Sequence, residues 1–488
     1  MDVVIEKINE VHLKITADPH IQYELRDRFT FEVPGKSFMP QFRKRNWNGE
    51  IHLFDLRTKR LYVGLLDKLV AFCENAGYTY EFKNNKFYGL PFEVNEMISK
   101  EGVKDYMASI IGSEIKPRDY QIDAVYDALR YNRKLLLSPT ASGKSLMIYS
   151  VVRFHVGCKR KVLLVVPTTS LVEQMFEDFK SYGWDVENHC HRIYAGRERV
   201  NTNEVTITTW QSVYQLDKTF FDAYDVIIGD EAHQFKSKSL IGIMEKLHDA
   251  KFRYGFTGTL DGTQTHKWVL EGLFGPSYKV TQTAKLQEQG HLALLDIRCL
   301  VLKHTPRKFE TYEDEIKYLI SHDSRNRFIS NLACDCDGNT LVLYTRVETH
   351  GAIIYDLINS KVREGRKVFF IHGGVGTEDR EQVRSITERE DDAIIVASYG
   401  CFSTGINIKK LHNLIFASPN KSRIRNLQSI GRVLRKGKDK IKAKLYDISD
   451  DITFRGRKNF TLNHFIERVK IYVSESFNYE ITSVDLKD

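Results

Sequence analysis

The sequence predicts an α/β protein with two tandem parallel-sheet lobes, preceded by a small N-terminal α+β domain. From about residue 116, short runs of aliphatic and β-branched residues alternate with longer amphipathic stretches. A second series of the same kind begins near residue 297. That alternation is typical of β-α-β units, in which helices cover both faces of a parallel sheet. Residues 1–105 are aromatic-rich and lack the alternation, so we expect them to form a separate domain.

The apolar runs give the expected strands in chain order. The first lobe should contain strands over 135–137, 162–166, 205–208, 225–229 and 252–257. The second should contain strands over 298–303, 340–345, 367–371, 393–397, 413–417 and 443–447, with helices over 348–362 and 377–389. The expected domains are therefore 1–105, 106–296 (the first lobe), 297–450 (the second lobe) and 451–488.

The two ends of the chain carry weaker signals. Asn48-Gly49 predicts a hairpin turn between Phe42-Arg43 and residues 51–54. Residues 460–488 predict one amphipathic helix followed by an extension, which we expect to pack on the second lobe. No apolar run approaches the ~20 residues that span a bilayer, and the first residues lack a signal-peptide profile. We therefore expect a cytoplasmic protein, in a host cell if phage-encoded, with no membrane partner.

Composition excludes some classes of protein. The 488 residues suggest roughly three domains, and 42% hydrophobic residues suffice for ordinary cores. The seven cysteines are scattered, and Cys334-Asp335-Cys336 has no second pair at metal-site spacing, which favours reduced structural thiols. Lys and Arg exceed Asp and Glu by 72 − 64 = 8, a modest surplus. Its placement is more informative, because basic residues crowd the segments 421–444 and 43–45, where they form either a solvated face or a phosphate-contacting surface.

A phosphate-binding loop is predicted between the first apolar run of lobe one and the amphipathic stretch after it. Ser138-Pro139-Thr140-Ala141-Ser142-Gly143-Lys144-Ser145 follows Leu135-Leu136-Leu137. Backbone N–H groups at a helix N-terminus can wrap a polyphosphate, and Gly143 permits close approach. Lys144 would reach the β- and γ-phosphates, and Ser145 would bind Mg²⁺. Ser138 and Ala141 occupy positions where such loops usually have glycine.

Two adjacent carboxylates end another buried run. Asp230-Glu231-Ala232-His233 follows Val226-Ile227-Ile228-Gly229. Asp230 would hold Mg²⁺, and Glu231 would orient and deprotonate an attacking water. Because nucleotide loops lie at the carboxyl ends of parallel strands, both segments should meet at one edge of the sheet. The sequence therefore predicts a site that binds and hydrolyses ATP with Mg²⁺.

The second lobe lacks a phosphate loop of its own but carries Gln428-Ser429-Ile430-Gly431-Arg432-Val433-Leu434-Arg435. Arg432 and Arg435 are spaced to point to one helix face. If that face meets ATP held by Lys144, both can act as arginine fingers, an effect worth about 10³–10⁵ in rate. A cleft that closes on ATP and reopens after hydrolysis would move the lobes, as a motor requires.

The ordered set of segments over roughly 116–450 resembles the superfamily 2 helicases, with the DEAH form of the carboxylate motif. Besides the segments above, the resemblance rests on the following stretches: 118–121, 166–174, 208–212, 256–260, 343–346 and 397–408. Residues 23–27, 42–51 and 396–405 look like those of phage recombination and repair helicases. The resemblance implies two RecA-like lobes and a motor that acts on branched DNA: Holliday-junction branch migration, fork regression, and D-loop and R-loop unwinding.

The resemblance also implies residue roles. Nucleotide contacts would come from Arg118, Gln121 as the adenine reader, Thr140, Ala141, Ser142, Gly143, Lys144, Ser145, Gly405 and Asn407, the last standing where the family often has an acid. DNA contacts would come from Arg43, Arg45, Trp47, Thr168, Thr169, Thr208, Trp210, Thr345, Arg346, Ser398 and Thr404. Hydroxyl groups suit phosphate contacts that position a strand without reading its sequence. Trp210 could equally belong to the core, and the segment around Trp47 could be a structural staple.

Three readings of function compete. The first is an ATP-dependent DNA helicase that remodels branched or duplex DNA, including RNA in hybrids, as a monomer, alongside recombination or replication proteins. The second is an RNA helicase or RNP remodeller, because the DEAH form also occurs there. The third is a nucleic-acid-binding module with a degenerate site, which the presence of Lys144, Glu231, Arg432 and Arg435 disfavours. A nuclease-coupled translocase lacks an adequate nuclease constellation.

Overall fold

The computed structural model describes residues 1–486 apart from 34, 113–114, 195–202, 259, 406–407, 409, 419 and 436–441, and omits the side chains of 377 and 403–405. The chain divides into two compact units. One comprises residues 1–138 and 143–280, and the other 139–142 and 281–488.

The N-terminal part of the first unit contains a four-stranded sheet in the order β5-β2-β1-β6. Its strands are β1 (Val3–Lys7), β2 (His12–Ala17), β5 (Arg60–Tyr62) and β6 (Tyr80–Lys83). Helices α1 (Pro19–Arg28) and α3 (Leu66–Ala76) belong to the same part. Strand β1 pairs antiparallel with β2 and parallel with β6, which confirms a mixed α+β arrangement.

A separate two-stranded ribbon corrects the predicted hairpin. Strand β4 (Glu50–His52) pairs antiparallel with β3 (Thr30–Glu32), not with Phe42-Arg43. Phe42 and Arg43 instead end the short helix α2 (Pro40–Arg43), which starts with proline at its first position. Proline is favoured there because its fixed φ suits a helix and its missing N–H is not needed. Gly49 does adopt a left-handed φ of 82°, so the turn residue before β4 was correctly identified.

The main sheet of the first unit is wholly parallel, with the order β13-β7-β12-β11-β8-β10-β9. Its strands are β7 (Arg133–Leu137), β8 (Val162–Val166), β9 (Cys190–Ile193), β10 (Val205–Thr209), β11 (Val226–Asp230), β12 (Phe252–Thr257) and β13 (Ser277–Lys279). The five predicted strands are confirmed within about two residues at each end. The edge strands β9 and β13 were not predicted.

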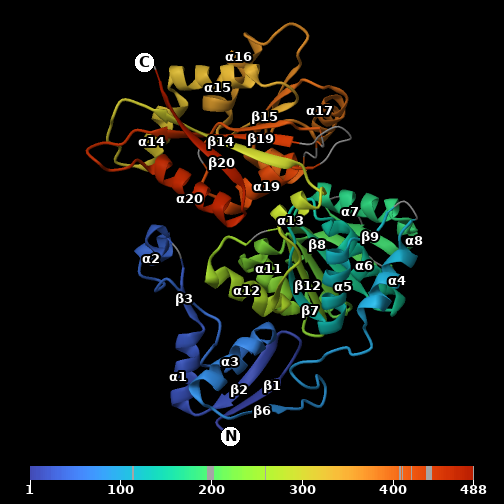
Figure 1. Cartoon of the computed structure of the whole chain (residues 1–488). Coiled ribbons are helices and arrows are strands. Elements are labelled where there is room, and N and C mark those ends of the chain that lie inside the picture. The colour runs from blue at the N-terminus through green and yellow to red at the C-terminus, as the bar shows by residue number, and fades with distance from the viewer. Residues whose placement is uncertain are drawn as a thin grey trace. The chain divides into compact units, whose positions relative to one another are not determined.

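Helices cover both faces of this sheet (Figure 1). One layer contains α5 (Asp119–Tyr131), α6 (Lys144–Gly157) and α7 (Thr169–Ser181), and the opposite layer contains α9 (Trp210–Val213), α11 (Lys238–Lys246) and α12 (Gln264–Phe274). The remaining helices of the unit are α4 (Lys100–Ile110), α8 (Val186–His189) and α10 (Lys218–Phe221). Strands β8, β10, β11 and β12 are buried along their whole length. The near-continuous apolar sequences of β8 and β11 follow from being covered on both faces, whereas β10 includes three threonines and β12 a buried arginine.

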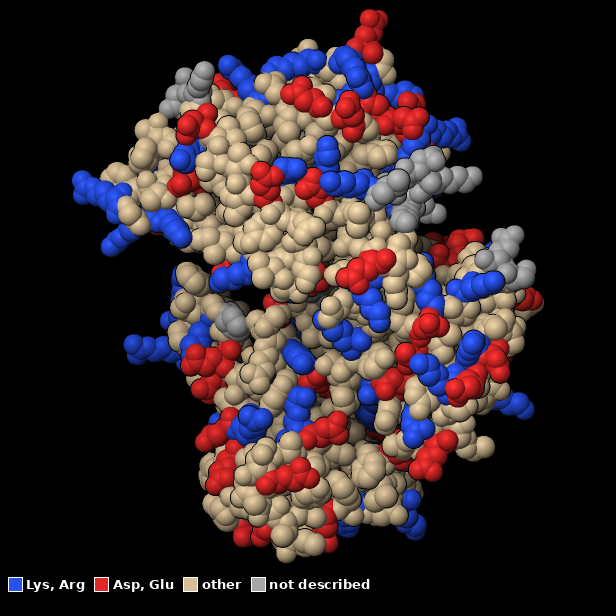
Figure 2. All heavy atoms as spheres, in the orientation of Figure 1, with Lys and Arg blue, Asp and Glu red and all other residues tan. Residues whose placement is uncertain are grey.

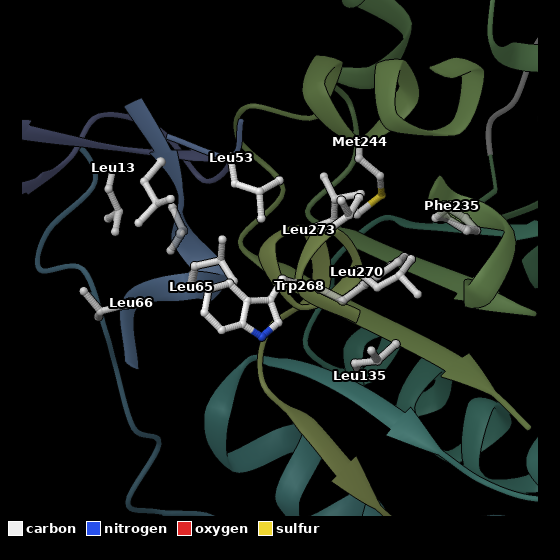
Figure 3. Close-up of a cluster of buried hydrophobic side chains, with 14 of the residues drawn as sticks. Leu13, Leu53, Leu65, Leu66, Leu135, Phe235, Met244, Trp268, Leu270 and Leu273 are labelled. Atoms are coloured by element: carbon white, nitrogen blue, oxygen red, sulfur yellow. The ribbon is translucent and has the colours of Figure 1, made fainter. Parts of the chain in front are cut away.

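The N-terminal sheet and the first lobe share one core. Figure 3 shows Trp268 of α12 between Leu53 and Leu65 on one side and Leu270, Leu273 and Met244 on the other. The indole also lies 5.5 Å from the ring of Phe29 and 5.0 Å from that of Phe31. Tyr62 donates a hydrogen bond to Glu245 at 2.8 Å, so polar contacts reinforce the apolar ones. The division of residues 1–296 into two domains remains a prediction.

The second unit holds another wholly parallel sheet, in the order β16-β17-β15-β18-β19-β14-β20. Its strands are β14 (Leu294–Lys303), β15 (Thr340–Tyr344), β16 (Val368–Ile371), β17 (Ile394–Ser398), β18 (Asn413–Phe416), β19 (Lys442–Asp451) and β20 (Asn478–Asp485). All six predicted strands are present, and β14 and β19 are longer than expected. The chain extension after residue 474 becomes β20, which pairs with β14 at the sheet edge.

Helices also cover both faces of the second sheet (Figure 1). One layer contains α15 (Asp323–Asp335) and α16 (Ala352–Asn359), and the other α18 (Tyr399–Gly405), α19 (Arg423–Val433) and α20 (Phe460–Ser474). The remaining helices are α13 (Thr283–Glu288), α14 (Tyr312–Ile320) and α17 (Thr377–Arg389). Helix α20 packs on β19. The tail therefore belongs to the second unit, as expected.

Surface charge is mixed. Figure 2 shows Lys and Arg interspersed with Asp and Glu over the visible face, without one large field of a single sign. No helix in the described part of the chain is both long and apolar enough to cross a membrane. All seven cysteines are free thiols.

Candidate active site

The phosphate loop lies where β7 turns into α6. The Ser138 N–H donates to the Thr257 carbonyl at 2.8 Å, so the loop starts tied to β12. The Ser142 hydroxyl and N–H both donate to the Pro139 carbonyl, at 2.7 and 3.2 Å, which closes a tight turn. Gly143 precedes α6 with φ at 81°, and Ala141 adopts a left-handed φ of 65°. The N–H groups and dipole of the α6 N-terminus favour an anion there.

Two features require glycine at position 143, its left-handed backbone angle and the closeness of the Gln121 side chain. A Cβ on Gly143 would lie 2.2 Å from Gln121 Nε2. Gln121 is buried, and its Oε1 accepts a hydrogen bond from the Arg118 N–H at 2.9 Å. The Arg118 guanidinium in turn donates to the Tyr120 hydroxyl at 2.7 Å. The structure therefore brings Gln121 of the predicted adenine-reading segment directly against the loop, with Arg118 hydrogen-bonded to Gln121.

The strand register brings the carboxylates to the same edge. Phe256 pairs with Asp230 and Thr257 with Leu137, so β7, β12 and β11 end side by side. Lys144 Nζ lies 3.3 Å from Glu231 Oε1 and 4.0 Å from Asp230 Oδ1. Glu231 itself adopts a left-handed conformation, with φ and ψ both 49°. Strain of about 1–3 kcal/mol at such a residue is typical of functional sites.

The environment shifts the pKa values of the two carboxyl groups in opposite directions. Burial raises the pKa of Asp230 to about 6, and the neighbouring Glu231 charge adds to this effect while Lys144 opposes it. Burial alone would also raise the pKa of Glu231, but Lys144 and a hydrogen bond from His233 lower it to about 2. The pKa of Glu231 is therefore held below that of Asp230, and Lys144 faces the Glu231 carboxylate.

The residues present fit a bound Mg²⁺. Asp230 Oδ1 is buried and has no hydrogen-bond partner within the described structure. Mg²⁺ in nucleotide sites is bound by one or two carboxylates together with phosphate oxygens and water, so one carboxylate oxygen and the Ser145 hydroxyl form a suitable donor set. The Ser145 hydroxyl makes a hydrogen bond with Tyr182. No cluster of three or more His, Cys, Asp or Glu side chains suited to a metal occurs among the described residues.

His233 and Thr257 were not named as site residues from the sequence. His233 Nδ1 lies 3.2 Å from Glu231 Oε2 and 3.0 Å from Thr257 Oγ1. Thr257 is the buried last residue of β12. The histidine therefore bridges the carboxylate segment and the strand end that precedes Gly258. The pairing of β11 with β12 is the feature that could have identified these two residues, because it places Asp230 opposite Phe256, the residue before Thr257.

The predicted arginines of the second unit lie around the end of α19. Arg432 is in its last turn, with the guanidinium carbon 5.3 Å from the centre of the Phe402 ring. Arg435 lies beyond the helix, and its N–H donates to the Arg432 carbonyl at 3.4 Å. The predicted approach of these arginines to Lys144 remains a prediction. Asn407 lies outside the described residues, as do the side-chain details of Thr404 and Gly405 in α18.

The predicted DNA contacts of the first lobe separate into two kinds. Thr168 caps α7, its Oγ1 accepting from the Leu171 N–H at 3.4 Å, and Thr169 is exposed in the first turn. Thr208, by contrast, is fully buried and donates to the Ile193 carbonyl at 2.8 Å. That hydroxyl ties β10 to β9, which corrects the expectation that it faces a strand of DNA. Trp210 is half-buried against the core and 5.7 Å from the Tyr214 ring.

The remaining predicted contacts lie at strand ends or in the N-terminal ribbon. Thr345 directly follows β15 and is exposed, with its N–H donating to Ser418 Oγ at 3.1 Å. Arg346 forms an ion pair with Glu313. Ser398 ends β17, and its hydroxyl accepts from the Cys401 N–H at 3.4 Å. Arg43, Arg45 and Trp47 belong to the segment that joins β3 to β4.

Two parallel-sheet units, one carrying a lysine loop and a DEAH carboxylate pair, define the class of superfamily 2 helicases. Three family models match the chain: the res subunit of type III restriction enzymes over residues 114–262, the N-terminal part of DNA helicase UvsW over 2–83, and the helicase conserved C-terminal domain over 324–437. The chain is 33% identical over 513 residues to the ATP-dependent DNA helicase uvsW of Enterobacteria phage T4, covering 100% of both chains. It belongs to the UvsW family of helicases.

Two further comparisons agree with this assignment. The crystal structure of T4 UvsW matches with a TM-score of 0.53 at 31% identity, covering 100% of each chain. The DNA 3'-5' translocase XPB2 of Sulfurisphaera tokodaii is 23% identical over 410 residues, covering 77% of this chain and 90% of that protein. As a helicase of this family, the protein uses a nucleotide and binds nucleic acid.

Proposed function

We propose that the protein is an ATP-dependent DNA helicase that remodels branched DNA in recombination and repair. The reactions would include Holliday-junction branch migration, fork regression and the unwinding of D-loops and R-loops. The observation that carries the proposal is the cluster of Lys144, Asp230 and Glu231 at one sheet edge, in a chain that aligns over its full length with a DNA helicase. We expect the working form to be a monomer.

The geometry gives each residue of the nucleotide site a role. The N–H groups at the start of α6 would bind the phosphates, with Lys144 moving from Glu231 to the β- and γ-phosphates. Gln121, whose side-chain amide lies against Gly143, would recognise the adenine. Asp230 and Ser145 would hold Mg²⁺, which when bound neutralises the phosphate charge. Glu231 would orient the attacking water and accept its proton, the task of a general base.

The second unit would complete the site. Arg432 and Arg435 would stabilise the charge that develops as the γ-phosphate leaves. Their shared position at the end of α19 supports this role, because both side chains start within one turn of each other. The stacking of Arg432 on Phe402 limits its side-chain freedom.

The DNA track would run over the exposed hydroxyl groups that follow the buried strands. Thr169, three residues after β8, and Thr345, directly after β15, are both exposed. Hydroxyl and backbone N–H groups there can contact phosphates without reading sequence. Arg346 and the basic N-terminal segment would add charge contacts.

The decisive experiment uses a synthetic four-way DNA junction with ATP and Mg²⁺. We expect strand exchange that requires ATP hydrolysis and ATP turnover that rises when DNA is added. No exchange, together with no stimulation by any DNA, would reject the proposal. An RNA competitor tests the alternative function, because a preference for RNA above about tenfold would identify an RNA remodeller. Equal turnover in wild type and Glu231→Gln would instead indicate a binding module.

A further inference from the structure

The segment that joins β3 to β4, residues 35–49, is called the arm here. Its tip exposes two large apolar side chains, with Phe38 77% and Met39 38% accessible to solvent. Figure 1 shows α2 at the end of the β3 ribbon farthest from α1. Exposed apolar side chains gathered at one place usually mark a contact surface.

The arm is held in shape by its own contacts. Arg43 Nε donates to the Ser37 carbonyl at 2.9 Å, which fixes the loop before α2 against the end of that helix. Lys36 Nζ lies 5.4 Å from the centre of the Phe42 ring. Trp47 Nε1 donates to the Glu50 carbonyl at 2.8 Å. The arm thus buries Phe42 and Trp47 partly against itself and leaves Phe38 and Met39 outside, so their exposure is built into the fold.

The base of the arm is fixed to the first lobe. The Val33 N–H donates to the Gly49 carbonyl at 2.8 Å, and β3 and β4 pair directly below. Phe31, in the middle of β3, packs edge-on against Trp268 of α12. Helix α12 packs on β7 and β12, the strands that lead to the phosphate loop and to Thr257. A motion of the first lobe along DNA would therefore carry the arm with it.

The positive charge of the arm favours an anionic partner. Between residues 35 and 49 the chain has Lys36, Arg43, Lys44 and Arg45 and no Asp or Glu. Arg43, Lys44 and Arg45 are exposed, and they follow the apolar tip within a few residues. An apolar tip surrounded by cations suits a DNA branch point, where phosphates surround a base pair with one open face. Apolar side chains that enter such a step unstack it, at a few kcal/mol per step.

We propose that the arm is a wedge for DNA branch points. Phe38 and Met39 contact the last stacked base pair at the branch, and Lys44 and Arg45 hold the phosphates on either side. This inference rests on the proposed function, because it gives the first lobe the element that converts movement along DNA into separation of strands. Phe38 and Met39 thereby become determinants of branched over linear substrates.

The test uses forked DNA with 2-aminopurine in the last base pair before the branch. Binding of wild-type protein without ATP should raise the fluorescence at least twofold, because the base loses its stacking. The Phe38→Ala, Met39→Ala double variant should abolish that rise at saturating protein. Its number of strands separated per ATP hydrolysed should fall at least tenfold on the same fork. The single variant Phe38→Trp, in which Met39 is unchanged, should show both signals.

Met97→Ala is the matched control, since Met97 is 94% exposed and lies outside the arm. It should leave both signals at the wild-type level, and equal thermal unfolding temperatures would show that all variants fold. No fluorescence rise with wild type, or an equal rise with the double variant, overturns the wedge. The fluorescence signal needs no ATP, so a failure of the proposed function, seen as absent ATP-driven exchange by wild type, is recorded separately.

Discussion

The Nδ1 atom of His233 lies 3.0 Å from the hydroxyl oxygen of Thr257 and 3.2 Å from Oε2 of Glu231. One side chain therefore joins the candidate catalytic carboxylate to the end of β12. From there the chain continues through Gly258 and Leu260 to α12, on which the arm is anchored. A movement of Glu231 can therefore be transmitted through these contacts to the part of the chain that we expect to touch DNA.

This bridge predicts coupling between His233 and Thr257. We expect His233→Ala and Thr257→Val each to reduce the stimulation of ATP turnover by DNA at least fivefold, with less than a twofold change in the KM for ATP. The two losses should not add in the double variant, because either change breaks the same bridge. Turnover measured with and without a DNA fork gives all three values. Losses that multiply would show that the two residues act independently.

Glu231→Gln should lower the kcat for ATP at least about 100-fold, because glutamine cannot accept the proton of the attacking water. The substitution keeps size and shape, so nucleotide binding should persist, which titration with a fluorescent ATP analogue would show. Asp225→Asn is a suitable control, because Asp225 precedes the same strand β11 but lies outside the site. A Glu231→Gln enzyme with more than a tenth of wild-type turnover would remove Glu231 from the role of general base.

Ala141→Gly should stabilise the protein. Ala141 has φ at 65°, where a residue with a Cβ is strained by about 1–2 kcal/mol. Glycine removes that strain but costs about 0.5–1 kcal/mol of unfolded-chain entropy, so the net gain should be about 0.5–1 kcal/mol. The opposite sign is expected for Ala108→Gly on the exposed face of α4, which should lose about 1 kcal/mol. Urea unfolding of both variants measures the difference, and a loss of stability in Ala141→Gly would contradict the strain argument.

The parts of the fold that could be predicted are those with strong local signals. Strands β8 and β11 are buried on both faces, so their apolar runs stand out. Strand β9, Cys190–Ile193, contains His191 and Arg192 and lies at a sheet edge, so it has no such signal. Strand β20 is almost wholly exposed and depends on pairing with the distant β14.

Side-chain roles were predictable only where the chemistry leaves one choice. Lys144 and Asp230-Glu231 could be found because phosphate and metal binding need those groups at strand ends. Thr208 was assigned to DNA although it lies in a strand buried along its whole length. Asn48-Gly49 is a strong turn signal and predicts a hairpin in the arm, whereas Met39-Pro40 marks a helix start only two residues before Phe42.

The second unit should lose stability in acid through Asp450. Its buried carboxylate accepts hydrogen bonds from Arg325 at 2.8 and 3.0 Å and lies 2.9 Å from His304 Nε2. Burial alone would raise the pKa of Asp450, but Arg325 and His304 outweigh it and hold that pKa well below its usual range. The stabilisation is thus fully present above the unfolded pKa of about 3.9 and is lost as the pH falls below it toward the lower folded value.

Asp450→Asn should therefore destabilise the second unit by about 3–5 kcal/mol at pH 7, because Arg325 would remain buried without a counter-charge. Its unfolding free energy should also depend less on pH than that of wild type between pH 5 and 3. Urea titrations over this range give both quantities. Glu310→Gln, at an exposed ion pair with Lys308, is the control and should change neither. Parallel acid slopes in wild type and Asp450→Asn would assign the acid sensitivity to other carboxylates.

Arg43→Ala combined with Arg45→Ala should weaken DNA binding and make it less sensitive to salt. Each phosphate that a cation neutralises releases about 0.9 counterion from duplex DNA, so the slope of log Kd against log salt should fall by about one for each arginine that binds a phosphate. Fluorescence anisotropy with a labelled fork at several salt concentrations measures that slope. Arg363→Ala is the control, because Arg363 pairs with Asp392 in the second unit and is not among the predicted DNA contacts. An unchanged slope together with an unchanged affinity in the double variant would show that the arm lies off the DNA, and would also count against the wedge. A weaker affinity at unchanged slope would instead reflect the missing hydrogen bond from Arg43 to Ser37 and a loosened arm.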